Sequence, residues 1–197
     1  MYYIVRHGQT EKNKKNLLQG RSNLPLNEEG RRQAAAAGEY FRKHGIVFDE
    51  IYSSPLDRAV ETALLIAGEN QEIITDERLL EMDYGPYEGI DLADPPAEII
   101  TFFKDFVHNP APDGMEQLSD VVRRTGEFME EIKGSDKNIL ISLHAISMKG
   151  ILEYLTPGSG GSWWSRYIGN CDIYCLENRD GEYGIPKKIE RKQEAEF

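Results

Sequence analysis

Two arginines and two histidines stand where expected strands end or expected helices begin: Arg6, His7, Arg58 and His144. An arginine side chain can bind phosphate oxygens through two parallel N–H donors. An imidazole is largely neutral near pH 7, so it can attack phosphorus without help from a strong base. These four side chains would suit the binding and transfer of a phosphoryl group if the fold brought them together.

A fifth candidate, Glu81, lies in the segment LLEMDYGPYEG after an expected strand. One carboxyl group can protonate a leaving oxygen and then activate water in the following step. Its acidic neighbours Glu77, Asp83 and Glu88 leave open the alternative that Glu81 is a solvated loop charge.

The elements that would position these residues alternate between strand and helix patterns. Short β-prone runs predict strands at 1–5, 50–52, 71–75 and 138–143. Asn27 is expected to cap a helix that ends near Gly45, and Ser54 to cap a helix with Pro55 at its first position. Amphipathic patterns predict further helices at 97–107, 118–132 and 146–155, and a C-terminal hairpin is expected from 171–178 and 183–190.

This alternation implies right-handed crossovers and a mostly parallel sheet with helices on both faces. The expected fold is therefore α/β, a three-layer α/β/α sandwich. In such a sheet, ligands bind at the carboxyl ends of the strands, which is where Arg6, His7 and His144 are expected.

Length and charge limit the classes of function. The 197 residues suit a single domain over 1–197, and the proline-rich stretches at 91–98 and 109–114 indicate a covering insertion at about 90–115. The net charge of −11 disfavours nucleic acid and anionic membranes, so a phosphate site must be a local positive pocket. Neither a secretion signal nor a membrane span is indicated, which favours the cytoplasm.

Five ordered segments resemble the histidine phosphatase superfamily, in its phosphoglycerate-mutase-like group: RHGQT, PLNEEGRRQA, SSPLDRAVETA, LLEMDYGPYEG and ILISLHAIS. The resemblance runs through most of the chain and implies the corresponding three-layer fold. It also implies a metal-independent phosphomonoesterase that needs no cofactor and acts on a small phosphate ester through a phosphohistidine intermediate.

By the same resemblance, His7 would be the nucleophile, and Glu81 would serve as acid and then as base. The phosphoryl and substrate oxygens would be held by a larger set: Arg6, Asn13, Gln19, Gly20, Arg58, His144 and Ala145. Phosphoryl transfer asks mainly for positioning and charge stabilisation, which fits these residue types.

The chain departs from the family pattern around its second histidine. The family commonly has Ser-His-Gly followed by an arginine, whereas this chain has Leu143, His144, Ala145 and later Lys149. An alanine still offers its backbone N–H to phosphate if its φ is negative. Two alternatives stay open: a cofactor-dependent phosphoglycerate mutase, and a non-catalytic phosphate-binding or regulatory protein. The sequence also leaves the substrate and the oligomeric state open.

Overall fold

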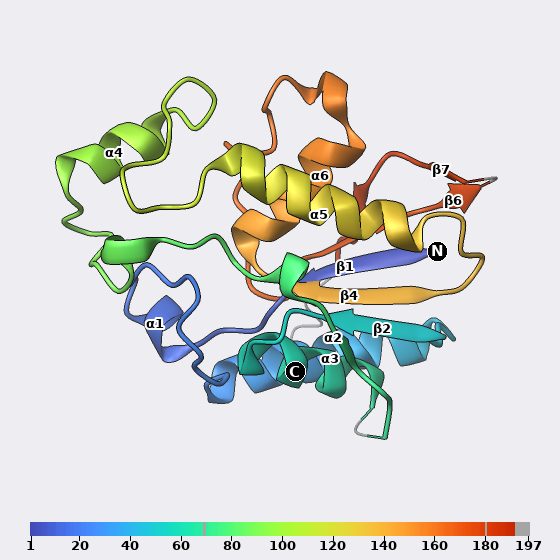
Figure 1. Cartoon of the computed structure of the whole chain (residues 1–197). Helices are drawn as coiled ribbons and strands as arrows, with labels where there is room; N and C mark the ends of the chain where they lie inside the picture. Colours follow the sequence, from blue (N-terminus) through green and yellow to red (C-terminus); the bar gives the residue numbers. More distant parts are fainter. Residues whose placement is uncertain (69, 180, 192–197) are drawn as a thin grey trace.

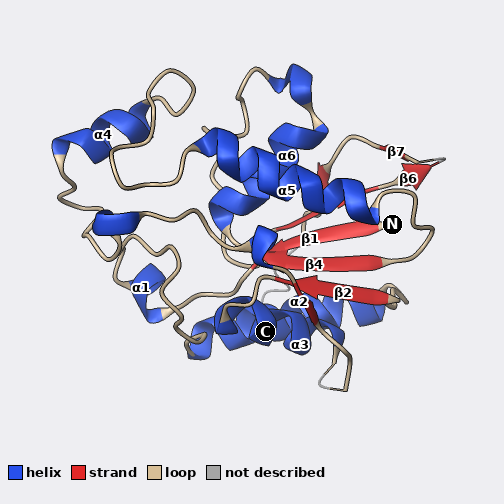
Figure 2. Ribbon diagram, in the orientation of Figure 1, coloured by secondary structure: helices blue, strands red, loops and turns tan. Residues whose placement is uncertain are grey.

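A central six-stranded sheet, with strand order β3-β2-β4-β1-β5-β8, organises the computed structural model, which describes residues 1–68, 70–179 and 181–191 (Figure 2). The four parallel strands are β1 (Tyr2–Arg6), β2 (Glu50–Ser53), β3 (Ile74–Thr75) and β4 (Ile139–Leu143). β5 (Ile173–Leu176) and β8 (Lys187–Lys188) run antiparallel at the other edge. The sheet is therefore mostly parallel, as predicted.

Helices cover both faces of the sheet (Figure 1). α2 (Glu28–Lys43) and α3 (Asp57–Ala67) pack on one face, where they share an apolar cluster with Tyr3 and Val5 of β1. α5 (Leu118–Ile132) and α6 (Ala145–Leu155) pack on the other face against Tyr2 and Ile4. Successive residues of β1 thus point to opposite cores, and the predicted three-layer α/β/α sandwich is confirmed.

The start of α2 was predicted correctly and the start of α3 was not. Asn27 caps α2 by accepting the Gly30 N–H at 2.9 Å, and Gly45 follows the helix with a φ of 66°. α3 begins at Asp57 rather than near Pro55, and its N-cap residue Leu56 makes no side-chain cap. The hydroxyl of Ser54 is used in the site instead.

The helix expected at 97–107 is shorter, because α4 (Ala97–Lys104) ends before Asp105. The Oδ1 atom of Asp105 accepts the N–H groups of Val107 and His108, both at 3.1 Å. Such local side-chain bonds offer the backbone an alternative to the helix. The strand expected at 71–75 is likewise reduced to Ile74–Thr75, which pairs with β2 alone at the sheet edge.

Four short helices complete the connections: α1 (Glu11–Lys14), η1 (Glu77–Leu79), η2 (Gly85–Tyr87) and η3 (Pro157–Ser159). The predicted C-terminal hairpin is present in two parts. Its tip is β6 (Asn178–Arg179) paired with β7 (Glu182–Tyr183), and its base is the β5–β8 pair. No helix in the described ranges is both long and apolar enough to cross a membrane.

Candidate active site

The two central parallel strands bring the histidines together. Arg6 pairs with Leu143 at the ends of β1 and β4, and the His7 N–H donates to the Leu143 carbonyl at 2.8 Å. His7 and His144 therefore leave neighbouring strands at the same carboxyl edge, with ring centroids 5.0 Å apart. The start of α3 brings Arg58 to this edge as well.

The imidazole of His7 is held through one ring nitrogen. Its Nδ1 atom lies 2.7 Å from the Gly8 carbonyl oxygen, which can only accept, so Nδ1 carries the proton and Nε2 keeps its lone pair. The ring is 3% exposed. Burial, together with the positive charges of Arg58 and Arg6, lowers the pKa of His7 well below 6.5. His7 is therefore a neutral imidazole near pH 7.

The backbone beside His7 requires glycine for reasons of packing. A Cβ on Gly8 would lie 2.4 Å from the Gly30 carbonyl oxygen, and a Cβ on Gly30 would lie 2.1 Å from the Gln9 carbonyl oxygen. The loop after β1 therefore passes directly against the first turn of α2, which keeps His7 at the sheet edge.

His144 is held at both ring nitrogens. The Nε–H of Arg58 donates to Nδ1 at 3.2 Å, so Nε2 carries the proton and donates to the Ser54 hydroxyl at 2.8 Å. Burial lowers the pKa of His144 well below 6.5, and the charge of Arg58 lowers it further. Ser54 is a site residue that the sequence analysis treated only as a helix cap. Its position four residues before Arg58, at the end of β2, was the available signal.

Arg58 is completely buried, and some of its N–H groups donate hydrogen bonds to the protein. Besides the His144 bond, Nη1 donates to the Ser22 carbonyl at 2.8 Å and Nη2 donates to the Gly20 carbonyl at 2.6 Å. Burial lowers the pKa of Arg58 to about 10, against the opposing charges of Glu81 and Glu88. Arg58 stays cationic, and each terminal nitrogen keeps one N–H for a ligand.

Glu88 fixes the loop of residues 20–22, whose carbonyl groups accept hydrogen bonds from Arg58. Its Oε2 atom accepts the N–H groups of Gly20 and Arg21 at 2.9 and 3.0 Å. Its Oε1 atom accepts from the Lys12 ammonium at 2.9 Å and from the Ser22 hydroxyl at 2.5 Å. The Gly20 N–H is therefore bonded to Glu88 and is not free for a ligand. Gly20 contacts the site through its carbonyl, which accepts from Arg58.

Three donors around His7 have no partner in the described part of the chain. The Nε atom of Arg6 and the Nε2 atom of Gln19 are both buried and unpaired, although the Gln19 oxygen accepts from Thr10 at 2.6 Å. The Ala145 N–H at the start of α6 is the third, and its φ is not positive, which meets the condition stated above. Buried unpaired donors such as those of Arg6 and Gln19 are costly, and a bound anion would be a partner for them; the half-buried Ala145 N–H is a further donor.

Asn13 contacts the site indirectly. Its Oδ1 atom accepts from the Thr10 N–H at 3.2 Å and from Nδ2 of Asn170 at 3.3 Å. Asn170 also donates to the His7 carbonyl at 3.0 Å. Asn13 can therefore offer a ligand only its amide N–H groups.

The carboxylate of Glu81 is buried at the N-terminus of α6. Its Oε1 atom accepts the N–H groups of Met82, Ile146 and Ser147 at 2.9, 3.1 and 3.1 Å. Its Oε2 atom shares only the Ile146 N–H, at 3.2 Å. Because Glu81 is 4% exposed, it is not a solvated loop charge, and Oε2 is the oxygen with capacity to carry a proton.

Across the described residues, no three His, Cys, Asp or Glu side chains form a group that could hold a metal ion. The charged groups at the centre are instead Arg6, Arg58 and Glu81, with Lys149 nearby. The cations among them outnumber the one carboxylate, so this part of an acidic chain carries local positive charge.

The buried histidines should make stability depend on pH. Their folded-state pKa values lie below 6.5, so the unfolded chain takes up protons that the native state does not. The free energy of unfolding should therefore fall as the pH drops below about 6.5, by up to about 1.4 kcal/mol per pH unit for each histidine. Urea unfolding between about pH 6.5 and 5.5 measures this slope. His7→Gln should reduce it, and an unchanged slope would contradict the assignment.

The sequence matches the histidine phosphatase superfamily (branch 1) over residues 2–188. It is 33% identical to the putative phosphoserine phosphatase 2 of Hydrogenobacter thermophilus, covering 87% of this chain and 86% of the relative. It is 34% identical to the 2,3-bisphosphoglycerate-dependent phosphoglycerate mutase of Parvibaculum lavamentivorans, covering 96% of each chain.

Solved structures have the same fold. A mycobacterial glucosyl-3-phosphoglycerate phosphatase in complex with VO3 aligns with a TM-score of 0.80 at 27% identity, covering 93% of this chain and 95% of that one. A phosphoserine phosphatase from Entamoeba histolytica aligns with a TM-score of 0.83 at 23% identity and 97% coverage of both chains, which concerns the fold alone. The relatives named as phosphatases confirm the predicted class, a phosphoric monoester hydrolase. The chain therefore belongs to the histidine phosphatase superfamily.

Proposed function

We propose that this chain is a metal-independent phosphomonoesterase that hydrolyses a small phosphate ester through a phosphohistidine intermediate. The observation that carries the proposal is the neutral His7 imidazole at the same sheet edge as two buried donors without a partner, Arg6 Nε and Gln19 Nε2, and the Ala145 N–H at the start of α6. Together with the remaining N–H groups of Arg58, they would bind the oxygens of a phosphoryl group. The arginines supply positive charge that a metal ion supplies in other phosphatases.

In the first step, Nε2 of His7 attacks phosphorus and the bond from phosphorus to the ester oxygen breaks. Glu81 gives its proton to that oxygen, and the alcohol leaves. In the second step, Glu81 takes a proton from water, the water oxygen attacks the phosphohistidine, and the bond from phosphorus to nitrogen breaks. Inorganic phosphate then leaves and Glu81 is protonated again. His144 would help to hold the phosphoryl oxygens by turning to them the Nε2–H that donates to Ser54 in this structure, while Arg58 keeps its Nδ1 atom in position.

A phosphoglycerate mutase is the second candidate, because a mutase matches this chain along 96% of its length. A mutase must keep its phosphoryl group from water until the second substrate accepts it. The two relatives named as phosphatases quoted above favour hydrolysis. A phosphate-binding protein without turnover is disfavoured by the arrangement of His7 and Glu81.

The covering segment at about 90–115 is proposed to shape the leaving-group side of the site, within a single catalytic domain over 1–197 that acts in the cytoplasm. Ile99 and Phe102 of α4 pack in one apolar cluster with Leu18, Tyr84 and Ile146. Through Leu18 this cluster links the segment to the loop that follows α1. Through Ile146 it links the segment to the first turn of α6, where the Ile146 N–H donates to Glu81.

A panel of phosphate esters, assayed for phosphate release in the presence of a metal chelator, tests this function. We expect turnover of at least one small ester at a rate that the chelator does not change. A rate that chelator abolishes and added divalent metal restores would contradict the proposal. Transfer of phosphate between glycerate positions without net release would favour the mutase.

A further inference from the structure

Lys149 stands beside the site, where the family resemblance leads one to expect an arginine. Its side chain is 9% exposed. The Nζ atom donates to the Trp164 carbonyl at 2.8 Å and lies 5.6 Å from the centre of the Phe106 ring. An ammonium has three N–H donors. Within the described chain this is its one hydrogen bond, so two donors of a buried cation remain for a ligand.

Lys149 lies on the face of α6 whose first turn holds Glu81. Lys149 follows Ala145 by four residues and Ile146 by three, so it lies on the same face of α6. Side chains on a helix lean toward its N-terminus, and there Ile146 holds Glu81. Burial lowers the pKa of Lys149 to about 8, the charge of Glu81 opposes this change, and the charge of Arg6 adds to it. The ammonium is therefore within electrostatic reach of both groups.

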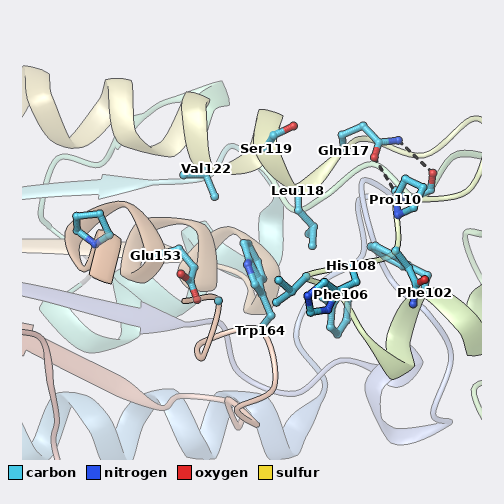
Figure 3. Close-up of a pocket in the computed structure, with 15 residues that line it drawn as sticks. Phe102, Phe106, His108, Pro110, Gln117, Leu118, Ser119, Val122, Glu153 and Trp164 are labelled. Atoms are coloured by element: carbon cyan, nitrogen blue, oxygen red, sulfur yellow. Dashed lines mark hydrogen bonds between the residues drawn. The ribbon is translucent and has the colours of Figure 1, made fainter. Parts of the chain in front are cut away.

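A groove of about 590 Å³, with both polar and apolar lining residues, adjoins the aromatic rings around Lys149. Phe106 and Trp164 line it, with ring centroids 6.4 Å apart, and Leu118 and Val122 lie across from them (Figure 3). Neither His7 nor His144 lines this groove. A leaving group bound in this groove would lie against Trp164 and Phe106, the two residues that contact the ammonium of Lys149.

We propose that Lys149 is a specificity-determining residue that binds a carboxylate on the leaving group; this rests on the proposed phosphomonoesterase function. A carboxylate has one negative charge and two acceptor oxygens, which match one positive charge with two free N–H donors. A hydroxyl would leave the buried charge uncompensated. A second phosphate would bring a charge of about −1.5 to −2, more than one ammonium neutralises.

Two esters with the same carbon chain test this assignment. 3-Phosphoglycerate carries a carboxylate where glycerol 3-phosphate carries a hydroxymethyl group. The ratio of their kcat/KM values, acid over alcohol, should fall roughly 10- to 100-fold in Lys149→Met, the effect expected for a lost charge-assisted hydrogen bond. A loss of folded protein or of catalytic rate would affect both substrates equally and would therefore cancel in this ratio. Lys104→Met, which removes an exposed charge from α4, should leave the ratio unchanged.

The pH dependence gives a second readout that a merely structural lysine would not produce. Lys149 is cationic below its pKa of about 8 and loses its charge above it, so the wild-type ratio should fall as the pH rises through that value. Lys149→Arg keeps the charge at every accessible pH, so its ratio should stay level. The phosphate group ionises alike in both esters and cancels.

Equal losses for both esters in Lys149→Met, or a wild-type ratio that does not change with pH, would overturn the assignment and leave Lys149 as a structural support for the Trp164 carbonyl. If the wild-type protein hydrolyses neither ester nor any other in the panel, the proposed function fails by itself. Calorimetric binding of the same two compounds then tests Lys149 separately. A preference for 3-phosphoglycerate that Lys149→Met removes would support it, and equal binding would overturn it.

Discussion

Replacing His7 with alanine should abolish turnover, with a loss of about 10⁴- to 10⁶-fold, while the protein stays folded. The size follows from the chemistry: Nε2 of His7 is the atom proposed to bond to phosphorus, and both ring nitrogens of the neighbouring His144 are bonded to Arg58 and Ser54. Steady-state hydrolysis of nitrophenyl phosphate measures the loss. A rapid quench with radiolabelled substrate should trap a labelled, acid-labile protein only in the wild type.

His44→Ala is a matched control, because it removes an exposed histidine at the end of α2. This variant should keep both turnover and the labelled intermediate. Substantial turnover in His7→Ala would disprove the phosphohistidine mechanism. If the wild-type protein became labelled but released no phosphate, the chain would instead be a phosphoryl-transfer protein that keeps its phosphoryl group from water.

Replacing Glu81 with glutamine should slow the first step by about 10²- to 10⁴-fold for alkyl phosphates and much less for nitrophenyl phosphate. An alkoxide leaves poorly without a proton, whereas a nitrophenolate leaves easily. Glutamine keeps the size and polarity of Glu81 but cannot give and take a proton. The measurement is kcat/KM, or the pre-steady-state burst, because dephosphorylation of His7 could limit the steady-state rate for both substrates.

Asp83→Asn is a suitable control for Glu81→Gln, because Asp83 is a neighbouring carboxylate that accepts the Gly85 N–H at 2.8 Å. It should leave the difference between alkyl and nitrophenyl substrates intact. Equal losses for both substrates in Glu81→Gln would mean that another group protonates the leaving oxygen. Glu88 is poorly suited to protonate the leaving oxygen, since its two oxygens already accept hydrogen bonds from Lys12 and from the Gly20 N–H.

Local sequence patterns were sufficient for most elements and for the edge at which the site lies. Asn27 and Gly45 bound α2 as predicted, since capping depends on neighbouring residues. The alternation of apolar strands with amphipathic helices implied a mostly parallel sheet. In such a sheet the carboxyl ends of the parallel strands lie at one edge, so His7 and His144 could be expected at that edge, whereas only the strand order makes β1 and β4 neighbours.

Contacts between distant parts of the chain decided the rest. Ser54 reads locally as a helix cap, yet its hydroxyl is used by His144, 90 residues away in sequence. Glu81 reads as one of several loop carboxylates until the N-terminus of α6, 65 residues later, supplies its N–H donors. Lys149 reads as a simple departure from a motif until Trp164 and Phe106 enclose it. Burial and partner choice set the charge state of a side chain, and both depend on packing that no local pattern encodes.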